Sequence, residues 1–155
     1  MNCLRIVAAV AFAFVIANSA VAQGKATLLP EAELGSKLQG NWVASSMNKE
    51  GVRVPDAEIE KLTAEFWEDQ FSMSPRGGRT GIVRFRIDAS QKLVRFDVAR
   101  QAGFDKIEIQ HGIIEWNGDS LRIALSLATS GPGSRPTDFS PKPGVLTLNL
   151  RRPIQ

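Results

Sequence analysis

Apolar and polar side chains alternate along most of this chain from residue 40 onward. In the stretch 83–87, Val, Phe and Ile occupy the odd positions and arginines the even ones; 94–98, 121–127 and 146–150 alternate similarly. A period of two indicates β-strands with one buried face and one solvated face. No helical stretch is long enough to cover such a sheet, so we predict an all-β fold that closes on itself.

Turn residues divide this region into about eight strands, the smallest number that commonly closes a barrel. The predicted strands are residues 41–47, 63–67, 71–74, 80–88, 93–100, 106–116, 120–127 and 145–152. Short helices are expected at 30–39, which begins with Pro30, and at 56–62, with Asp56 as the N-cap. Gly77-Gly78 predicts a tight hairpin turn. The expected architecture is an antiparallel up-and-down barrel with one or two short helices.

One predicted strand, 106–116, changes its apolar phase. Ile107 and Ile109 share one parity, whereas Ile114 and Trp116 share the other. A β-bulge at residues 111–112 would absorb that change, because it adds one residue to one strand of a pair.

The first 22 residues have the features of a signal peptide. Arg5 precedes an apolar run at 6–17, and Ala20-Val21-Ala22 forms a small-x-small cleavage site. The apolar run is shorter than the roughly 20 residues that a membrane-spanning helix needs. We therefore expect an exported protein, periplasmic or secreted and without a membrane span, with a leader at 23–37 and one barrel domain at 38–152.

Composition excludes several classes of function. The chain has 19 Lys and Arg against 16 Asp and Glu, a balance too even to predict nucleic-acid binding. Cys3, the single cysteine, lies in the predicted signal peptide, and His111 is the single histidine. No metal cluster, cofactor motif or nucleophile–base pair is visible, so we expect neither a cofactor nor an enzyme. We also expect a monomer.

Several motifs resemble those of a known family. Gly40 and Trp42 form the Gly-x-Trp that opens the first strand of lipocalin-like barrels. Further motifs are Gly-Ile-Ile-Glu at 112–115, Gly-Asp-Ser-Leu at 118–121, Arg-Pro-Thr-Asp-Phe at 135–139 and Lys-Pro-Gly at 142–144. Together they resemble the lipocalin-like domain of unknown function that is expanded in planctomycete bacteria. The resemblance covers residues 38–152 and implies an exported barrel without an established activity.

The same resemblance predicts a contact between the two ends of the domain. In lipocalin-like barrels the tryptophan plugs one end and stacks against a basic residue of the last strand. Arg152 shares the parity of the apolar residues at 146, 148 and 150, whereas Arg151 points the other way. Trp42 and Arg152 are then either the floor of a ligand cavity or a structural plug of the barrel end.

The other candidate sites also have a functional and a structural interpretation. Phe85 and Phe96 either line a ligand cavity or fill the core. The wider set of candidate lining residues is Phe66, Phe71, Phe85, Phe96, Ile109, Ile123 and Leu125.

Arg135 and Asp138 lie in the long loop 129–144, which is a candidate binding loop at the barrel rim. Arg135 either binds a carboxylate or phosphate or pairs with a nearby acid of the chain, and Asp138 can hydrogen-bond the loop backbone. In the structural interpretation Phe139 lies in the core and the loop only closes a barrel end. A third candidate is a row of outward-facing arginines that forms either a basic stripe or a mixed-charge surface: Arg84, Arg86, Arg95 and Arg122.

These observations favour an exported binding module that takes a small apolar or amphipathic ligand in the barrel. The alternative is a protein-interaction or inhibitor module that binds an envelope protein through the loop 131–143 or through the arginine-rich outer face. An interior filled by side chains would favour the alternative, since a filled barrel has no room for a ligand.

Overall fold

The computed structural model describes residues 31–75, 81–101, 104, 106–127 and 134–154. The described residues form two helices, α1 (Glu31–Leu38) and α2 (Asp56–Ile59), and nine strands, β1 (Gly40–Lys49), β2 (Val52–Arg53), β3 (Leu62–Trp67), β4 (Gln70–Pro75), β5 (Val83–Asp88), β6 (Val94–Gln101), β7 (Ile107–Asn117), β8 (Ser120–Ser126) and β9 (Val145–Arg151). The predicted signal peptide and the Gly77-Gly78 hairpin lie outside the described residues.

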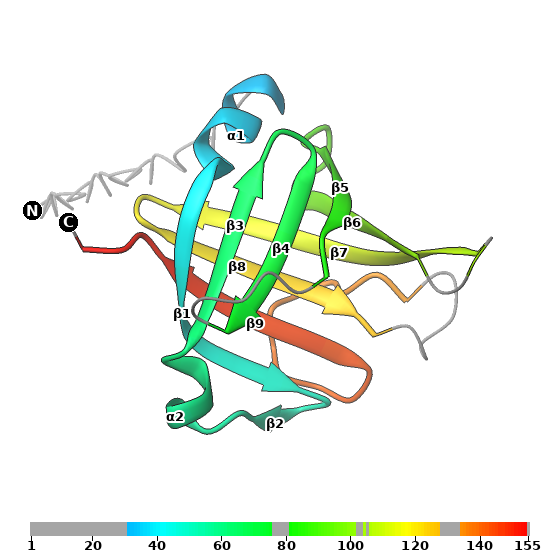
Figure 1. The fold of residues 1–155 in the computed structure, drawn as a ribbon. Helices are drawn as coiled ribbons and strands as arrows, with labels where there is room; N and C mark the ends of the chain where they lie inside the picture. Colours follow the sequence, from blue (N-terminus) through cyan, green and yellow to red (C-terminus); the bar gives the residue numbers. More distant parts are fainter. Residues whose placement is uncertain (1–30, 76–80, 102–103, 105, 128–133, 155) are drawn as a thin grey trace, which may run out of the picture.

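The strands form one closed antiparallel sheet. Their order is β2-β1-β3-β4-β5-β6-β7-β8-β9, and β9 pairs back to β1. Eight strands therefore close the barrel, while the two-residue β2 pairs with the last two residues of β1 (Figure 1). The predicted all-β, up-and-down antiparallel barrel is confirmed.

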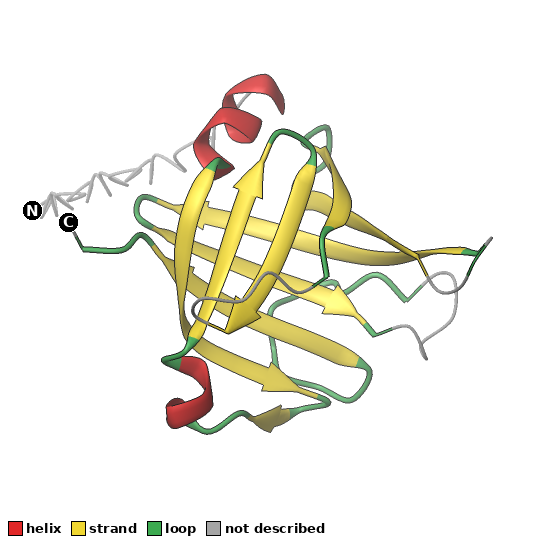
Figure 2. Cartoon of the chain, viewed as in Figure 1, coloured by secondary structure: helices red, strands yellow, loops and turns green. Residues whose placement is uncertain are grey.

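The two helices lie at opposite ends of the strand wall (Figure 2). In α1, Leu34 and Leu38 are spaced one turn apart and both are buried, so this helix covers the barrel end near the start of β1. The second helix is shorter than predicted, because Leu62 already belongs to β3. Asp56 is not its N-cap: Pro55 holds that position, and the Asp56 carboxylate accepts a hydrogen bond from Arg53 instead.

The predicted bulge at residues 111–112 is wrong. β7 pairs with β6 in one uninterrupted register from Ile107 to Ile114. Ile107 and Ile109 therefore lie on the outer face, together with His111 and Ile113. The apparent change of phase arises because the outer face is exposed at Ile107 and Ile109 but buried at Ile113. The register shift of this sheet lies in β1, between Ala44 and Ser46, where β1 pairs with β9.

The core has two parts. The larger part fills the barrel interior with residues such as Trp42, Phe66, Phe96 and Leu150. A smaller cluster lies on the outside of β7, β8 and β9 and consists of Ile113, Ala124 and Val145, with Phe139 packed against it. The outer cluster exists because the segment 134–144 crosses this part of the outer wall. Among the described residues, no helix is long and apolar enough to cross a membrane.

Candidate functional site

The predicted pairing of Trp42 with Arg152 is confirmed. Trp42 is fully buried at the start of β1, and its indole Nε1 donates a hydrogen bond to the Leu38 carbonyl at 2.8 Å. The Arg152 guanidinium lies over the ring, 3.9 Å from its centroid. It also donates to the carbonyls of Lys37 at 2.6 Å and Gln39 at 2.9 Å. These contacts tie the chain after β9 to the end of α1 and close this end of the barrel.

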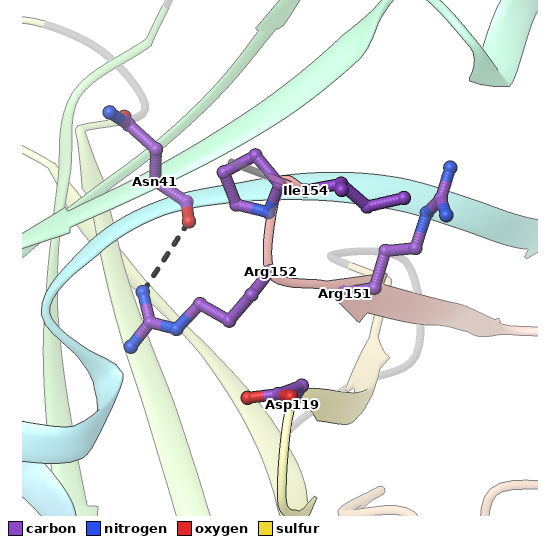
Figure 3. A pocket seen from close by; sticks show the side chains of 6 residues that line it. Asn41, Asp119, Arg151, Arg152 and Ile154 are labelled. Carbon is purple, nitrogen blue, oxygen red and sulfur yellow. Dashed lines mark hydrogen bonds between the residues drawn. The ribbon is translucent and has the colours of Figure 1, made fainter.

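A pocket of about 800 Å³ lies beside Arg152 (Figure 3). It is lined by Asn41, Asp119, Arg151, Arg152, Pro153 and Ile154. The Arg152 side chain lines this pocket, and its guanidinium also donates a hydrogen bond to the Asn41 carbonyl at 3.4 Å. Burial lowers the pKa of Arg152, and the charge of Asp119 opposes that effect. Because the Arg152 guanidinium already donates to the carbonyls of Lys37, Gln39 and Asn41, it is engaged within the protein itself.

Aromatic rings fill the barrel interior around Phe85 and Phe96. The centroids of these two rings lie 5.4 Å apart, and both rings contact Phe66, at 5.5 Å and 6.3 Å respectively. Phe71 packs on Phe66 at 4.7 Å and on Phe96 at 6.0 Å. These are ordinary packing distances between aromatic rings. A ligand could occupy this part of the barrel only by displacing the rings.

The other candidate lining residues divide into two groups. Ile123 and Leu125 are buried in the interior core as expected. Ile109 is 58% exposed, so its assignment to the cavity lining is wrong. It lies on the outer face of β7, opposite Ala99 of β6, because the strand has no bulge to turn it inward.

Arg135 anchors the segment 134–144 across the outer wall of the barrel. Its Nη1 donates to the Gly112 carbonyl at 2.6 Å and lies 2.7 Å from Asp97 Oδ1. Its Nη2 donates to Asp97 Oδ2 at 3.0 Å and lies 3.2 Å from His111 Nδ1. Such a two-pronged arginine–carboxylate pair fixes both position and orientation. Arg135 therefore holds the chain of this protein, as the structural interpretation predicted.

The Asp97 carboxylate is the charged centre of this anchor. Burial raises its pKa, but hydrogen bonds from Arg135 and His111 outweigh burial and hold the pKa of Asp97 below its usual value. His111 Nδ1 lies 3.1 Å from Asp97 Oδ1, and the His111 backbone N–H donates to the Ser126 hydroxyl. An acid–histidine contact is one element of acid–base chemistry, but here both carboxylate oxygens are engaged by Arg135.

Asp138 and Phe139 complete the crossing segment. The Asp138 carboxylate accepts a hydrogen bond from the Ser140 backbone N–H at 2.8 Å and pairs with Lys142 at 3.2 Å. These contacts lower the pKa of Asp138, the bond from the Ser140 backbone most strongly. Phe139 packs on the outer cluster rather than in the barrel core, with the Arg122 guanidinium 4.5 Å from its ring centroid. Both residues stabilise the loop itself.

The outward arginines do not form a continuous basic stripe. Three of them pair with acids: Arg84 with Asp69, Arg95 with Asp88, and Arg122 with Glu115. Arg86 lies opposite Asp97 across β5 and β6. This is the mixed-charge surface that the structural interpretation predicted.

The sequence interpretation missed an exposed apolar surface where β5 begins, β6 ends and β7 begins. Phe104 is 102% exposed, Ile107 71%, Ile109 58% and Ile82 51%. β7 pairs with β8 only from Gly112 onward, so the hairpin of β6 and β7 projects past the neighbouring strand (Figure 1). The off-phase isoleucines at 107 and 109 were the signal for this surface.

A pocket of about 380 Å³ lies at this end of the barrel. Its apolar lining is Ile82, Val83, Ala99, Phe104 and Ile107, and its polar lining is Arg84, Arg100, Gln101 and Lys106. The Glu108 carboxylate joins Arg100 and Lys106, each at 2.8 Å, and both contacts lower its pKa. We call the exposed residues Ile82, Arg84, Arg100, Phe104, Lys106, Ile107 and Ile109 the hairpin face.

Within the described residues, no group of three or more acidic, histidine or cysteine side chains could hold a metal ion. The chain has no significant match among the profiles of known protein families, the curated proteins or the solved structures. Membership of the lipocalin-like family from planctomycetes therefore stays a prediction from the sequence motifs.

Proposed function

We propose that this protein is an exported, lipocalin-like binding module that holds an amphipathic anion on the hairpin face, outside a barrel filled by side chains. The observation that carries the proposal is the pocket of about 380 Å³ in which exposed apolar side chains meet arginine and lysine. An apolar chain gains free energy from contact with Ile82, Phe104 and Ile107, because these side chains otherwise face water.

The charged lining selects for an anionic group on the same ligand. Arg84 and Lys106 have side chains that are 76% and 72% exposed, so their guanidinium and ammonium groups remain accessible. Their pairs with Asp69 and Glu108 are surface ion pairs, which are weak and exchange readily. A carboxylate, sulfate or phosphate on the ligand can therefore compete for these cations.

The barrel interior is the less favoured place for the ligand. Phe66, Phe71, Phe85 and Phe96 contact one another there at centroid distances of 4.7 to 6.3 Å. An interior ligand would have to separate these rings and would forfeit their packing. The hairpin face needs no such rearrangement.

The alternative of a protein-interaction module on the loop 131–143 has less support. In the described part of that loop, Arg135 and Asp138 are used by contacts within the chain. The proposal also assigns no enzymatic role to His111, because its contact with Asp97 belongs to the anchor of that loop.

Export is part of the proposal through the predicted signal peptide at residues 1–22. Analysis of the purified protein by intact-mass spectrometry tests it. Loss of residues 1–22 is expected, and an uncleaved N-terminus in the exported fraction would contradict it.

Titration with dodecanoate tests the binding function. We expect chemical-shift changes in the NMR spectrum at Ile82, Ala99 and Ile107. Ile107→Ser should weaken binding about tenfold, because it removes roughly 1.4 kcal/mol of apolar contact. Ile154→Ser is the matched control, since Ile154 is 87% exposed and lines the pocket at the Arg152 end. Shift changes confined to Phe85 and Phe96 would instead place the ligand inside the barrel and overturn the proposal.

A further inference from the structure

We propose that the hairpin face docks this protein onto anionic lipid bilayers, with Phe104 and the exposed isoleucines in the interfacial layer. The inference rests on the proposed function, because it assigns the amphipathic anion to a lipid at a membrane surface. It adds that the bilayer itself, rather than a freely dissolved amphiphile, is the partner.

The isoleucines of the hairpin face lie together on one side of the sheet. The β6–β7 register sets Ala99 opposite Ile109 and Gln101 opposite Ile107, and the β5–β6 register sets Arg84 opposite Ala99. Ile82 shares the parity of Arg84, two positions earlier, and lines the same pocket as Ile107. Cross-strand neighbours on one face are in contact distance of each other. The isoleucines therefore form a patch and are not scattered single residues.

The apolar surface of the described residues is concentrated here. Of the large exposed hydrophobic residues, Ile82, Phe104, Ile107 and Ile109 belong to the hairpin face. The remaining ones lie in separate places, namely Val52 in β2, Leu93 before β6 and Ile154 after β9. A concentrated apolar patch marks an interaction surface, whereas single exposed residues need no explanation.

The shape of this surface favours a fluid partner. The Phe104 side chain is 102% exposed, so it projects from the hairpin without packing against the barrel. A projecting side chain needs either a partner with a matching cavity or a medium that adapts to it. The interfacial layer of a bilayer adapts to an inserted apolar side chain without a preformed cavity.

Charge complementarity favours an anionic bilayer in particular. Arg84, Arg100 and Lys106 line the same pocket as Ile82, Phe104 and Ile107, and the acids that pair with them are Asp69 and Glu108. Arg84 lies on the side of the isoleucines, whereas Arg100 pairs with Glu108 on the other side of the β6–β7 hairpin. Glu108 is shared by two cations, which leaves the group with one more positive charge than negative. Apolar insertion combined with basic side chains at the surface is the combination that retains peripheral proteins on anionic membranes.

Co-sedimentation of the purified exported protein with vesicles tests the inference. The vesicles consist of phosphatidylcholine alone or of phosphatidylcholine mixed with phosphatidylglycerol. We expect binding to the mixed vesicles that weakens in high salt, because salt screens the attraction between surface charges. Phe104→Ser should lower the partition coefficient about tenfold, and Ile154→Ser should leave it unchanged. Equal thermal stability of both variants excludes unfolding as the cause.

Fluorescence of a Phe104→Trp variant gives a second, direct measurement. Its emission should shift to the blue when vesicles containing phosphatidylglycerol are added, because the indole leaves water. An Ile154→Trp variant should show no shift. The same shift in both variants would indicate unspecific adsorption and overturn the docking surface.

Comparison with dodecanoate separates the two proposals. Binding of dodecanoate without binding of vesicles would overturn membrane docking and leave the proposed function intact. Failure of both would overturn both. Binding to neutral vesicles with equal affinity would contradict the role of the cations. The inference would also be overturned if the protein bound no vesicles and formed a dimer that Phe104→Ser converts to monomer. That result would assign the hairpin face to a second copy of this chain.

Discussion

The guanidinium carbon of Arg152 lies 3.9 Å from the centroid of the Trp42 ring, so the residue after β9 closes over the residue near the start of β1. The same guanidinium donates hydrogen bonds to the carbonyls of Lys37 and Gln39. A single side chain thus links the helix α1, the first strand and the end of the last strand.

Replacement of Arg152 by Ala should therefore lower the free energy of unfolding by about 2 kcal/mol. It removes a cation–π contact and leaves part-buried carbonyls without their donor. Urea unfolding measures the change. Arg151→Ala is the control, because Arg151 is exposed on the opposite parity, and it should change stability by less than about 0.5 kcal/mol. Equal effects of the two replacements would refute the role of the plug.

Gly112→Ala should destabilise the barrel by about 1–3 kcal/mol or more. A Cβ at this position would lie 2.6 Å from the Ala124 carbonyl oxygen and 2.8 Å from that of Phe96, so backbone would have to move. Thermal unfolding followed by circular dichroism measures the effect. Gly35→Ala is the matched control: its Cβ meets nothing within 4 Å, and alanine favours the helix α1, so stability should rise slightly.

Replacement of a buried and of an exposed phenylalanine should affect stability very differently. Phe96 is fully buried among aromatic rings, and Phe96→Ala should cost about 3–5 kcal/mol. Phe104 is fully exposed, and Phe104→Ala should change stability by less than about 0.5 kcal/mol. Denaturant unfolding of both variants measures the difference. A large loss of stability in Phe104→Ala would mean that this side chain supports the fold.

Acid should weaken the anchor of the segment 134–144. The pKa of Asp97 lies below its usual 3.8 in the folded protein, so the unfolded chain takes up a proton first as the pH falls. The stabilising effect is complete above the unfolded pKa and disappears as the pH falls through the folded pKa. The difference in unfolding free energy between the wild type and Asp97→Asn should therefore shrink between about pH 5 and pH 2.

Hydrogen exchange of residues 134–144 locates that effect. Asp97→Asn should increase exchange there at neutral pH, because Arg135 loses its charged partner. Asp88→Asn serves as the comparison, since the pKa of Asp88 is also lowered, first by its bond to Ser90, but Asp88 has no contact with Arg135. Unchanged exchange in Asp97→Asn would show that the other contacts of the segment, such as the Arg135 bond to the Gly112 carbonyl and the packing of Phe139, hold it without the Asp97 charge.

The sequence predicted those features that depend on local periodicity. Alternation at 83–87 and 121–127 placed Phe85 and Ile123 on inner faces, because side chains of a strand alternate strictly between two sides. The same parity argument selected Arg152 over Arg151 as the partner of Trp42. These predictions depend only on the parity of each residue in its strand and on closure of the strands into one barrel.

Other features depended on segments that are distant in the sequence. The sequence left open whether Arg135 binds a ligand or the chain itself, since its partner Asp97 lies in β6, 38 positions away. A strand pattern cannot show which loop crosses which outer face. The anchor around His111 and the position of Phe139 were for that reason visible only in the structure.

Ile109 and Ile113 show most clearly that the parity of a residue does not predict its burial. Both lie on the outer face of β7, and their parity is readable from the sequence. Ile113 is buried because Phe139 packs against its cluster, whereas Ile109 is 58% exposed because β8 does not extend alongside it. Local sequence decides the side on which a residue lies. Only the path of the remaining chain decides whether that side is covered, because burial depends on contacts between residues far apart in sequence.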